Sequence, residues 1–366
     1  MTRGRRKSGL EDSERITDYP RLGKSSLRVS KVILGCMSYG NKGWANWVLE
    51  GDEALQHFKT AYDLGITTWD TADTYSGGDS ERLVGQAITK FNLPRENLVI
   101  LTKLAMVVPD DPTIHPSSIQ NPNQSGYVNR WGVSRKHVFA AVDASLDRLG
   151  LDYVDVLQIH RFPVADFDEH TMQELMIALH DVVKSGKVRY IGMSSCYAWQ
   201  FHAMQAFARE NKLTPFVSMQ DFHNSVYREE EREMFKTCEL FGTGIIPWSP
   251  LARGFLTRPH RDQNNTERAK SDPNFAKFVG LGNKVEEEAL QQINEAVEKI
   301  AKDRGVSMAQ VALAWSLSNP LVTAPIVGST RVEALREAAA ATHLKLTEDE
   351  IKAINEPYRP RNILGH

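Results

Sequence analysis

The sequence has few cysteines, and their spacing fits neither a disulfide-rich nor a zinc-binding protein. Only Cys36, Cys196 and Cys238 occur among the 366 residues, and no two of them have Cys-x-x-Cys spacing. An odd number of widely separated cysteines favours neither a disulfide framework nor a zinc ribbon. A reducing compartment fits this pattern.

Long apolar runs and a large net charge are also missing. No run approaches the roughly 20 apolar residues that cross a bilayer, and no apolar core follows the basic start MTRGRRKSGLEDSERI. A net charge of −2 and a pI of about 6.6 give no electrostatic case for nucleic acid or anionic membranes. We expect a cytoplasmic protein with a small-molecule substrate and a disordered basic tail at residues 1–16. A nucleic-acid or targeting role for this tail is the minor alternative.

Several common catalytic motifs do not occur. The chain has no G-x-S-x-G elbow, no H-E-x-x-H pair and no G-x-x-x-x-G-K-[ST] loop, which disfavours the commonest serine hydrolases, zinc proteases and phosphate-loop enzymes. The G-x-G at Gly242–Gly244 precedes an apolar run instead of following one, so it is better interpreted as a helix C-cap. Any dinucleotide must therefore bind to a surface other than a Rossmann fingerprint, and we expect no metal site.

The chain does contain a repeated alternation of apolar runs and helical patterns. With 41% hydrophobic residues, it can build one large barrel or two medium domains. Eight apolar runs of strand length, each followed by a helical pattern, predict a parallel sheet and an α/β fold. We expect one (β/α)8 TIM barrel over residues 17–366 without a domain boundary. The eight predicted strands are Val32–Gly35, Thr67–Asp70, Leu98–Lys103, Tyr153–His160, Val188–Ser194, Phe216–Asp221, Gly244–Trp248 and Thr323–Val327.

Other segments do not follow the alternation. Tyr19–Leu22 and Leu27–Val29 flank a turn and predict an N-terminal β-hairpin that plugs one end of the fold. Extra helices are expected near the C-terminus, namely Val285–Arg304 and a short helix that starts with the Thr-x-x-Glu capping box at Thr347. We also expect Ser80 to cap a helix, a helix over Glu229–Phe241, and a polar loop over Ser249–Lys284. The loops Ser38–Gly51 and Leu104–Gly132 are long enough to serve a function. Tryptophans in the first loop either form the wall of an aromatic pocket or only pack over the barrel.

Four ionisable residues lie at or just after predicted strands. Asp70 and Tyr75 follow the run ITTW, Lys103 ends LVILTK, and His160 ends YVDVLQIH. The carboxyl ends of parallel strands share one rim of a barrel, so these groups are expected to converge there. Taken singly, Asp70 could cap a helix and Tyr75 could be packing.

Together these residues suit proton transfer to an oxygen. A free tyrosine has a pKa of about 10 and is a weak acid near neutrality. An ammonium within hydrogen-bonding range makes the phenol a better proton donor, and a carboxylate holds that ammonium in place. The neutral His160 imidazole could fix a carbonyl oxygen against Tyr75. The set is suited to protonating an oxygen while hydride reaches the adjacent carbon.

The motifs DTADTY, LTK and DVLQIH resemble, in order and context, the catalytic tetrad of the aldo-keto reductases. The resemblance runs from about Tyr19 to Ala341. The phrase CMSYGNKGWANWVLEGDEA looks like the fungal branch that contains aryl-alcohol dehydrogenases and versiconal hemiacetal acetate reductase.

This resemblance implies NADPH-dependent reduction of small or aromatic aldehydes or ketones, with NADH as an alternative cofactor and a monomer or weak homo-oligomer as the assembly. Tyr75 would donate the proton, Lys103 and Asp70 would tune it, and His160 would orient the carbonyl. The cofactor would be held by Ser194, Ser195, Gln220, Trp248, Ser249, Leu251, Gly328, Ser329, Arg331 and Glu337.

The chain departs from many relatives at the adenine end. Small residues at Gly328, Ala334 and Ala338 replace polar or basic ones, which leaves Arg331 as the candidate for the 2′-phosphate. Ser329 could instead be a plain helix cap, and Arg331 a solvated charge. A different class of function also stays open, since potassium-channel β subunits share this fold and tetrad and act largely as nucleotide-sensing regulatory subunits.

Overall fold

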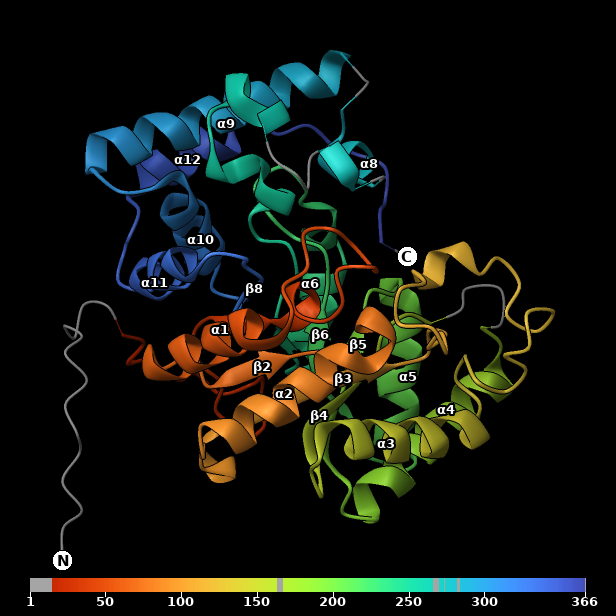
Figure 1. The fold of residues 1–366 in the computed structure, drawn as a ribbon. Coiled ribbons are helices and arrows are strands. Elements are labelled where there is room, and N and C mark those ends of the chain that lie inside the picture. Colours follow the sequence, from red (N-terminus) through yellow and green to blue (C-terminus); the bar gives the residue numbers. More distant parts are fainter. Residues whose placement is uncertain (1–14, 163–166, 266–269, 273, 282–283, 366) are drawn as a thin grey trace, which may run out of the picture.

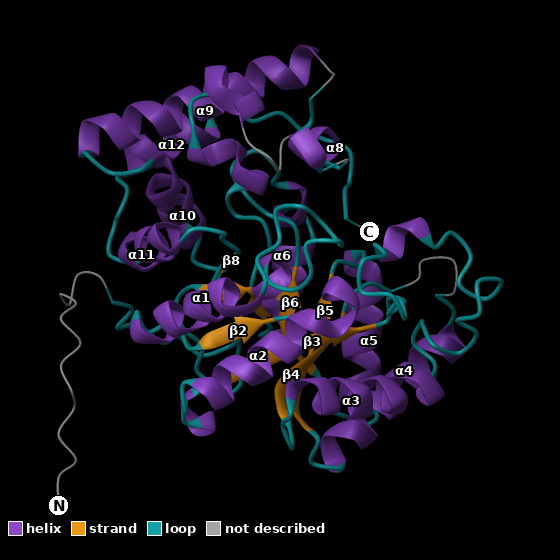
Figure 2. Cartoon of the chain, viewed as in Figure 1, coloured by secondary structure: helices purple, strands orange, loops and turns teal. Residues whose placement is uncertain are grey.

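The computed structural model describes residues 15–162, 167–265, 270–272, 274–281 and 284–365. Most of the predicted basic tail, residues 1–14, lies outside this set. Eight parallel strands form one sheet in the order β7-β6-β5-β4-β3-β2-β1-β8, with helices packed around it (Figures 1 and 2). The strands are β1 (Ile33–Gly35), β2 (Thr68–Asp70), β3 (Val99–Leu104), β4 (Val154–Ile159), β5 (Val188–Ser194), β6 (Phe216–Gln220), β7 (Gly244–Ile245) and β8 (Ile326–Val327).

The sheet curls so that its two edges approach each other. Isolated parallel bridges join Ile245 to Val322 and Trp248 to Ile326, and the Ile326 N–H donates to the Pro247 carbonyl at 2.8 Å. The edge strands β7 and β8 are shorter than predicted because Pro247 and Pro325 have no N–H to donate to a strand ladder. The fold is α/β with eight parallel strands, consistent with a (β/α)8 barrel.

The helices that follow the strands contact both the sheet and one another. The helices of the barrel wall are α1 (Gly51–Asp63), α2 (Asp79–Lys90), α3 (Arg135–Leu149), α4 (Glu169–Lys184), α5 (Ala198–Glu210) and α6 (Met234–Phe241). The later helices are α8 (Phe275–Val279), α9 (Lys284–Arg304), α10 (Met308–Ser318), α11 (Val332–Ala341) and α12 (Glu348–Asn355). Helix α9 contacts α10 and α12. Helices α9 and α12 form an upper layer away from the strands, and α10 lies between this layer and α11 (Figure 1).

The N-terminal segment covers the end of the sheet opposite the carboxyl ends of the strands. Arg21 and Arg28 form an antiparallel bridge, and Leu22 and Val29 are fully buried in a small cluster with strand residues such as Leu101. Gly23 has φ +59°, and a Cβ there would lie 2.5 Å from the Gly242 carbonyl oxygen. Only glycine lets the chain approach the sheet so closely.

Two sequence predictions about helix starts are wrong. The helix expected over Glu229–Phe241 begins only at Met234, because Glu233 has the non-helical φ of −133°. Ser80 was expected to cap α2, but Gly78 occupies the cap position with φ +92°. The buried Ser80 hydroxyl instead donates to the Cys36 carbonyl at 2.9 Å.

The segment Ser249–Lys284, expected to be a polar loop, contains α8 and two short 3-10 helices, Ala252–Thr257 and His260–Asn265. The Gln263 amide holds this segment by donating to the Phe255 carbonyl at 2.8 Å. Such side-chain contacts leave no periodic pattern in the sequence. Within the described residues, no helix has the length and apolar character needed to span a membrane.

Candidate active site

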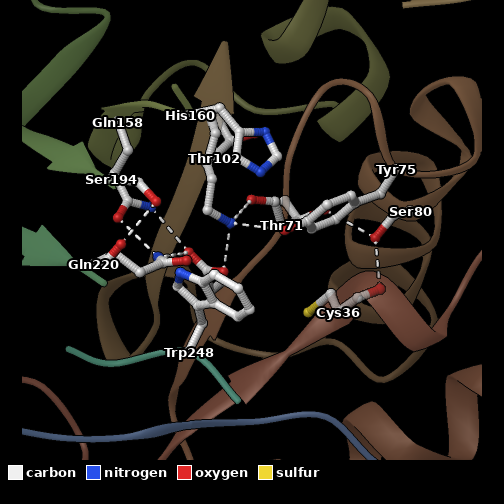
Figure 3. Close-up of polar contacts among 12 residues, drawn as sticks. Cys36, Thr71, Tyr75, Ser80, Thr102, Gln158, His160, Ser194, Gln220 and Trp248 are labelled. Carbon is white, nitrogen blue, oxygen red and sulfur yellow. Dashed lines mark hydrogen bonds and ion pairs between the residues drawn. The ribbon is translucent and has the colours of Figure 1, made fainter. Parts of the chain in front are cut away.

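The four residues expected to carry chemistry lie at or just after the carboxyl ends of β2, β3 and β4. Figure 3 shows Tyr75 and His160 among the polar contacts at this site. Asp70 ends β2, Lys103 lies near the end of β3, and His160 follows β4 directly. Tyr75 begins the 3-10 turn Tyr75–Gly78 after β2. Lys103 is fully buried and Asp70 is 2% exposed, so this cluster forms the floor of a cavity instead of a solvated surface.

Lys103 uses all three ammonium hydrogens within this cluster. Its Nζ donates to Asp70 Oδ2 at 2.6 Å, to the Thr71 carbonyl at 2.9 Å and to the Tyr75 phenol oxygen at 3.3 Å. Burial works against the ammonium charge, but Asp70 and Tyr75 outweigh it, so the pKa of Lys103 is raised. Lys103 therefore stays charged and rigidly oriented.

Two glutamine side chains hold the other oxygen of Asp70. The amide nitrogens of Gln158 and Gln220 each lie 2.9 Å from Asp70 Oδ1, and Gln220 also donates to Gln158 Oε1 at 2.9 Å. Gln220 was predicted to help hold the cofactor; its amide nitrogen is directed at Asp70. A carboxylate held by this many donors keeps its position.

His160 lies across the cavity floor from the phenol. The rings of Tyr75 and His160 are 5.5 Å apart between centroids and nearly perpendicular, at 83°. Burial, with help from Lys103 and Arg161, holds the pKa of His160 well below its usual value, so the imidazole is neutral. Burial raises the pKa of Tyr75, and the nearby Lys103 charge only partly offsets this.

A cavity of about 550 Å³ opens above this floor. Three of the four predicted catalytic residues line it, namely Asp70, Tyr75 and His160, while Lys103 lies behind them. Most of the predicted cofactor residues also line it: Ser194, Gln220, Trp248, Ser249, Leu251, Gly328, Ser329, Arg331 and Glu337. The cavity thus runs from the ionisable cluster to the start of α11. The binding roles of these residues stay predictions.

Ser195 is the one predicted cofactor residue that is not among the lining residues. Its hydroxyl accepts a hydrogen bond of 3.1 Å from Trp248 Nε1, and its φ of +42° is unusual for a residue with a side chain. Phe222 stacks on Trp248 with centroids 4.5 Å apart. A Cβ on Gly365 would lie 3.4 Å from the Trp248 ring, so the C-terminal segment also supports this wall.

The opposite end of the cavity has two arginines. Arg331 is exposed and Arg258 is half-buried; burial and the neighbouring Arg331 charge both lower the pKa of Arg258. The Ser329 hydroxyl accepts from the Arg331 N–H at 3.0 Å, so it stabilises a local turn and not the first turn of α11. Glu337 accepts a 2.8 Å hydrogen bond from Ser307.

The two long loops, Ser38–Gly51 and Leu104–Gly132, both contribute residues to the cavity lining. Trp44 and Trp47 are both lining residues, as is Met106. Trp44 stacks on His115 with ring centroids 4.7 Å apart and an angle of 25°. The tryptophan-bearing loop therefore forms a pocket wall and packs against the second loop as well.

Sequence reasoning missed Gln158, Arg161 and Arg258. Gln158 could have been found, because it precedes His160 by two residues and side chains two apart on a strand share a face. Arg161 follows His160 directly in QIHRF, and a charged residue at the end of an apolar strand is itself a signal. Nothing local distinguishes Arg258 from a surface arginine.

Comparisons with known proteins agree with this geometry. The model of the Aldo/keto reductase family matches residues 31–359. Versiconal hemiacetal acetate reductase from Aspergillus parasiticus is 48% identical over 347 residues, 94% of this chain and 98% of that protein. A Schizosaccharomyces pombe protein provisionally named an aryl-alcohol dehydrogenase is 47% identical over 355 residues, 95% of this chain and 97% of its own. Aldo-keto reductase dtxS3 from Metarhizium robertsii is 42% identical over 362 residues, 97% of this chain and 94% of its own. With the family model and full-length relatives in agreement, this chain belongs to the aldo/keto reductase family.

Proposed function

We propose that this protein is an NADPH-dependent oxidoreductase that reduces aldehydes or ketones, aromatic ones included, with Tyr75 as the proton donor. The observation that carries the proposal is the direction of the bond between Lys103 and Tyr75. Because Lys103 is charged and can only donate, the phenol oxygen accepts and its own hydrogen must point elsewhere. Within the described part of the chain no acceptor takes that hydrogen, so it is available to a substrate oxygen in the cavity.

The lining residues fit a nicotinamide dinucleotide. Trp248 offers a flat aromatic wall beside the ionisable cluster, and Arg258 and Arg331 offer positive charge at the far end. Gly328 lines the passage between them, where a Cβ would come within 3.2 Å of Ser38 Oγ. Ser194 and Trp248 would hold the nicotinamide end, and Arg331 with Arg258 would hold the 2′-phosphate. When bound, the cofactor would supply the hydride.

The chain's own residues then have distinct tasks. The substrate oxygen would lie between the Tyr75 hydroxyl and the His160 imidazole, which is neutral and can donate one hydrogen bond. His160 Nδ1 is buried and has no partner among the described residues, so Nε2 would be the ring nitrogen that meets the substrate oxygen. Lys103 stabilises the phenolate that remains after proton donation, and Asp70 keeps Lys103 in place.

The names of the relatives support the substrate class. One is named a versiconal hemiacetal acetate reductase and another provisionally an aryl-alcohol dehydrogenase. Trp44 and Trp47 add aromatic surface to the cavity. Nothing observed in the described residues favours the alternative of a nucleotide-sensing regulatory subunit.

The test is a panel of aliphatic and aromatic aldehydes and ketones, followed by loss of NADPH or NADH absorbance in parallel. We expect steady turnover of at least one aromatic aldehyde, faster with NADPH than with NADH at low cofactor concentration. Tight NADPH binding without turnover of any carbonyl compound would argue for the regulatory alternative.

A further inference from the structure

Arg161 lies at the reacting end of the cavity, directly after His160. Its Nη1 donates to the His160 carbonyl at 2.6 Å and to the Ser194 hydroxyl at 3.1 Å, and its guanidinium carbon lies 5.6 Å from the Trp248 ring centroid. The residue lines the same cavity as the Tyr75 phenol. Both bonds use a single nitrogen, so the other donors of the guanidinium are not engaged by the described residues.

Arg161 differs from the other largely buried arginines in having no carboxylate partner. Within the described ranges, no acidic side chain lies at ion-pair distance from it. Four other arginines of low exposure are each paired with a carboxylate: Arg95 with Asp155, Arg148 with Glu81, Arg253 with Asp272, and Arg361 with Glu286. The half-buried Arg258 also has no ion pair among the described residues, and it is the arginine proposed to hold a phosphate. A buried charge without a partner is costly, and it is retained where a ligand provides the partner.

The groups around Arg161 do not neutralise it. Lys103 and Asp70 balance each other, and Tyr75 and His160 are neutral. Asp221 acts on the guanidinium from farther away, but burial, reinforced by Glu230, raises the pKa of the Asp221 carboxyl well above its usual value. Burial lowers the pKa of Arg161, yet an arginine remains charged at neutral pH. Among the described residues, the Arg161 guanidinium therefore has no ion-pair partner at the reacting end of the cavity.

Under the proposed function, the nicotinamide end of the cofactor lies near Arg161. The carboxamide of the nicotinamide is neutral, so it would not balance the charge of Arg161. An anion within reach of the Arg161 guanidinium must then come from the substrate. Planar carboxylates match the guanidinium fork in shape and charge. The aromatic walls at Trp44, Trp47 and Trp248 suit a ring that carries this carboxylate.

We propose that Arg161 binds a carboxylate of the carbonyl substrate, so that the pocket selects aldehydes or ketones that also carry an acidic group. This inference rests on the proposed function and adds the substrate class to it. It makes Arg161 a specificity-determining residue.

The test compares the ortho, meta and para isomers of formylbenzoate with their methyl esters, which have the same reacting group without the charge. For wild type with saturating NADPH, we expect kcat/KM for at least one formylbenzoate to exceed that of its ester by about tenfold or more, the effect of one charge-assisted contact. Arg161→Met should abolish this preference for the acid, mainly by raising the KM of the acid, and should change kcat/KM of the esters little. Arg161→Lys should keep part of it.

Arg258→Met is the matched control, because it removes an arginine from the same cavity at the other end. It should weaken NADPH binding but leave the ratio of acid to ester unchanged at saturating cofactor. Thermal unfolding and NADPH binding verify that each variant is folded; if Arg161→Met is not, Arg161→Gln and Arg161→Lys replace it.

Two results would overturn the inference: wild type that prefers every ester over its acid, or Arg161 variants that slow acids and esters equally. The second would assign Arg161 to catalysis or to structure. Failure of the proposed function looks different, since wild type would then reduce neither acids nor esters with either cofactor.

Discussion

Gln158 and Asp70 are 88 residues apart in the chain, and the Gln158 amide donates a 2.9 Å hydrogen bond to Asp70 Oδ1. The other oxygen of the same carboxylate accepts from Lys103. Asp70 is thereby held from two sides and cannot rotate away from the lysine. The orientation of Lys103 toward Tyr75 depends on this support.

Replacing Gln158 by methionine should therefore reduce activity without removing any proposed catalytic group. Loss of one buried donor to a carboxylate costs about 1–3 kcal/mol of stability, and kcat should fall by roughly tenfold as Lys103 becomes less fixed. The measurements are the free energy of unfolding and the kcat for an aromatic aldehyde.

Gln205→Met is the control for this change. Gln205 is equally buried but bonds to the Phe216 backbone and to Thr243, away from the ionisable cluster. It should lower stability by a similar amount and leave kcat close to wild type. Equal losses of kcat in both variants would show that Gln158 acts only through overall stability.

Tyr75→Phe should bind NADPH nearly as well as wild type and lose most carbonyl reduction. The phenol is the proposed proton donor, and general acid catalysis contributes about 10²–10⁴ in rate. Single-turnover reduction and NADPH fluorescence titration measure the two effects separately. Tyr153→Phe, a tyrosine stacked against Arg95 outside the cavity, should be neutral; unchanged reduction by Tyr75→Phe would reject the assignment.

Exchanging Arg331 for alanine should weaken NADPH much more than NADH. A lost charge-assisted contact to the 2′-phosphate amounts to about 10–100-fold in Kd, whereas NADH has no such phosphate. Arg336→Ala, an exposed arginine of the same helix that does not line the cavity, is the control. Parallel losses for both cofactors would remove Arg331 from the phosphate site.

The rate of carbonyl reduction should depend little on pH between about 6 and 9. Reduction needs a protonated phenol and a neutral imidazole. Because the pKa of Tyr75 is raised, the phenol keeps its proton up to a pH above the usual value of about 10. Because the pKa of His160 is lowered, the imidazole stays neutral down to a pH well below about 6.5. The check is a pH profile of kcat/KM in NADPH-saturated enzyme; an inflection near pH 7 to 8 would contradict these assignments.

Much of the fold and of the cluster at its rim could be predicted because the signals are local. Apolar runs of strand length predict each strand, and Asp70, Lys103 and His160 lie at the ends of such runs, where parallel strands share a rim. The resemblance to a family then predicted the role of each of these residues. A capping box at Thr347 is confirmed for the same reason, since it is a pattern of four neighbouring residues.

Other features depend on contacts between segments far apart in the chain and could not be predicted. Gln220 bonds to Asp70 across 150 residues, and the Ser195 hydroxyl is taken by Trp248 across 53. In both cases the residue type fits several partners, and only packing decides among them. That no described carboxylate pairs with Arg161 is likewise visible only in the structure, because sequence spacing does not say which side chains surround it.

The contact between Gly365 and Trp248 has a practical consequence for anyone who purifies this protein. The described residues up to Gly365 are held there, because Leu364 and the Tyr227 phenol exchange hydrogen bonds and a Cβ on Gly365 would lie 3.4 Å from the Trp248 ring. A purification tag fused at this end is therefore expected to alter ligand affinity by itself. Recombinant protein for the assays above should carry its tag at the other terminus, or none.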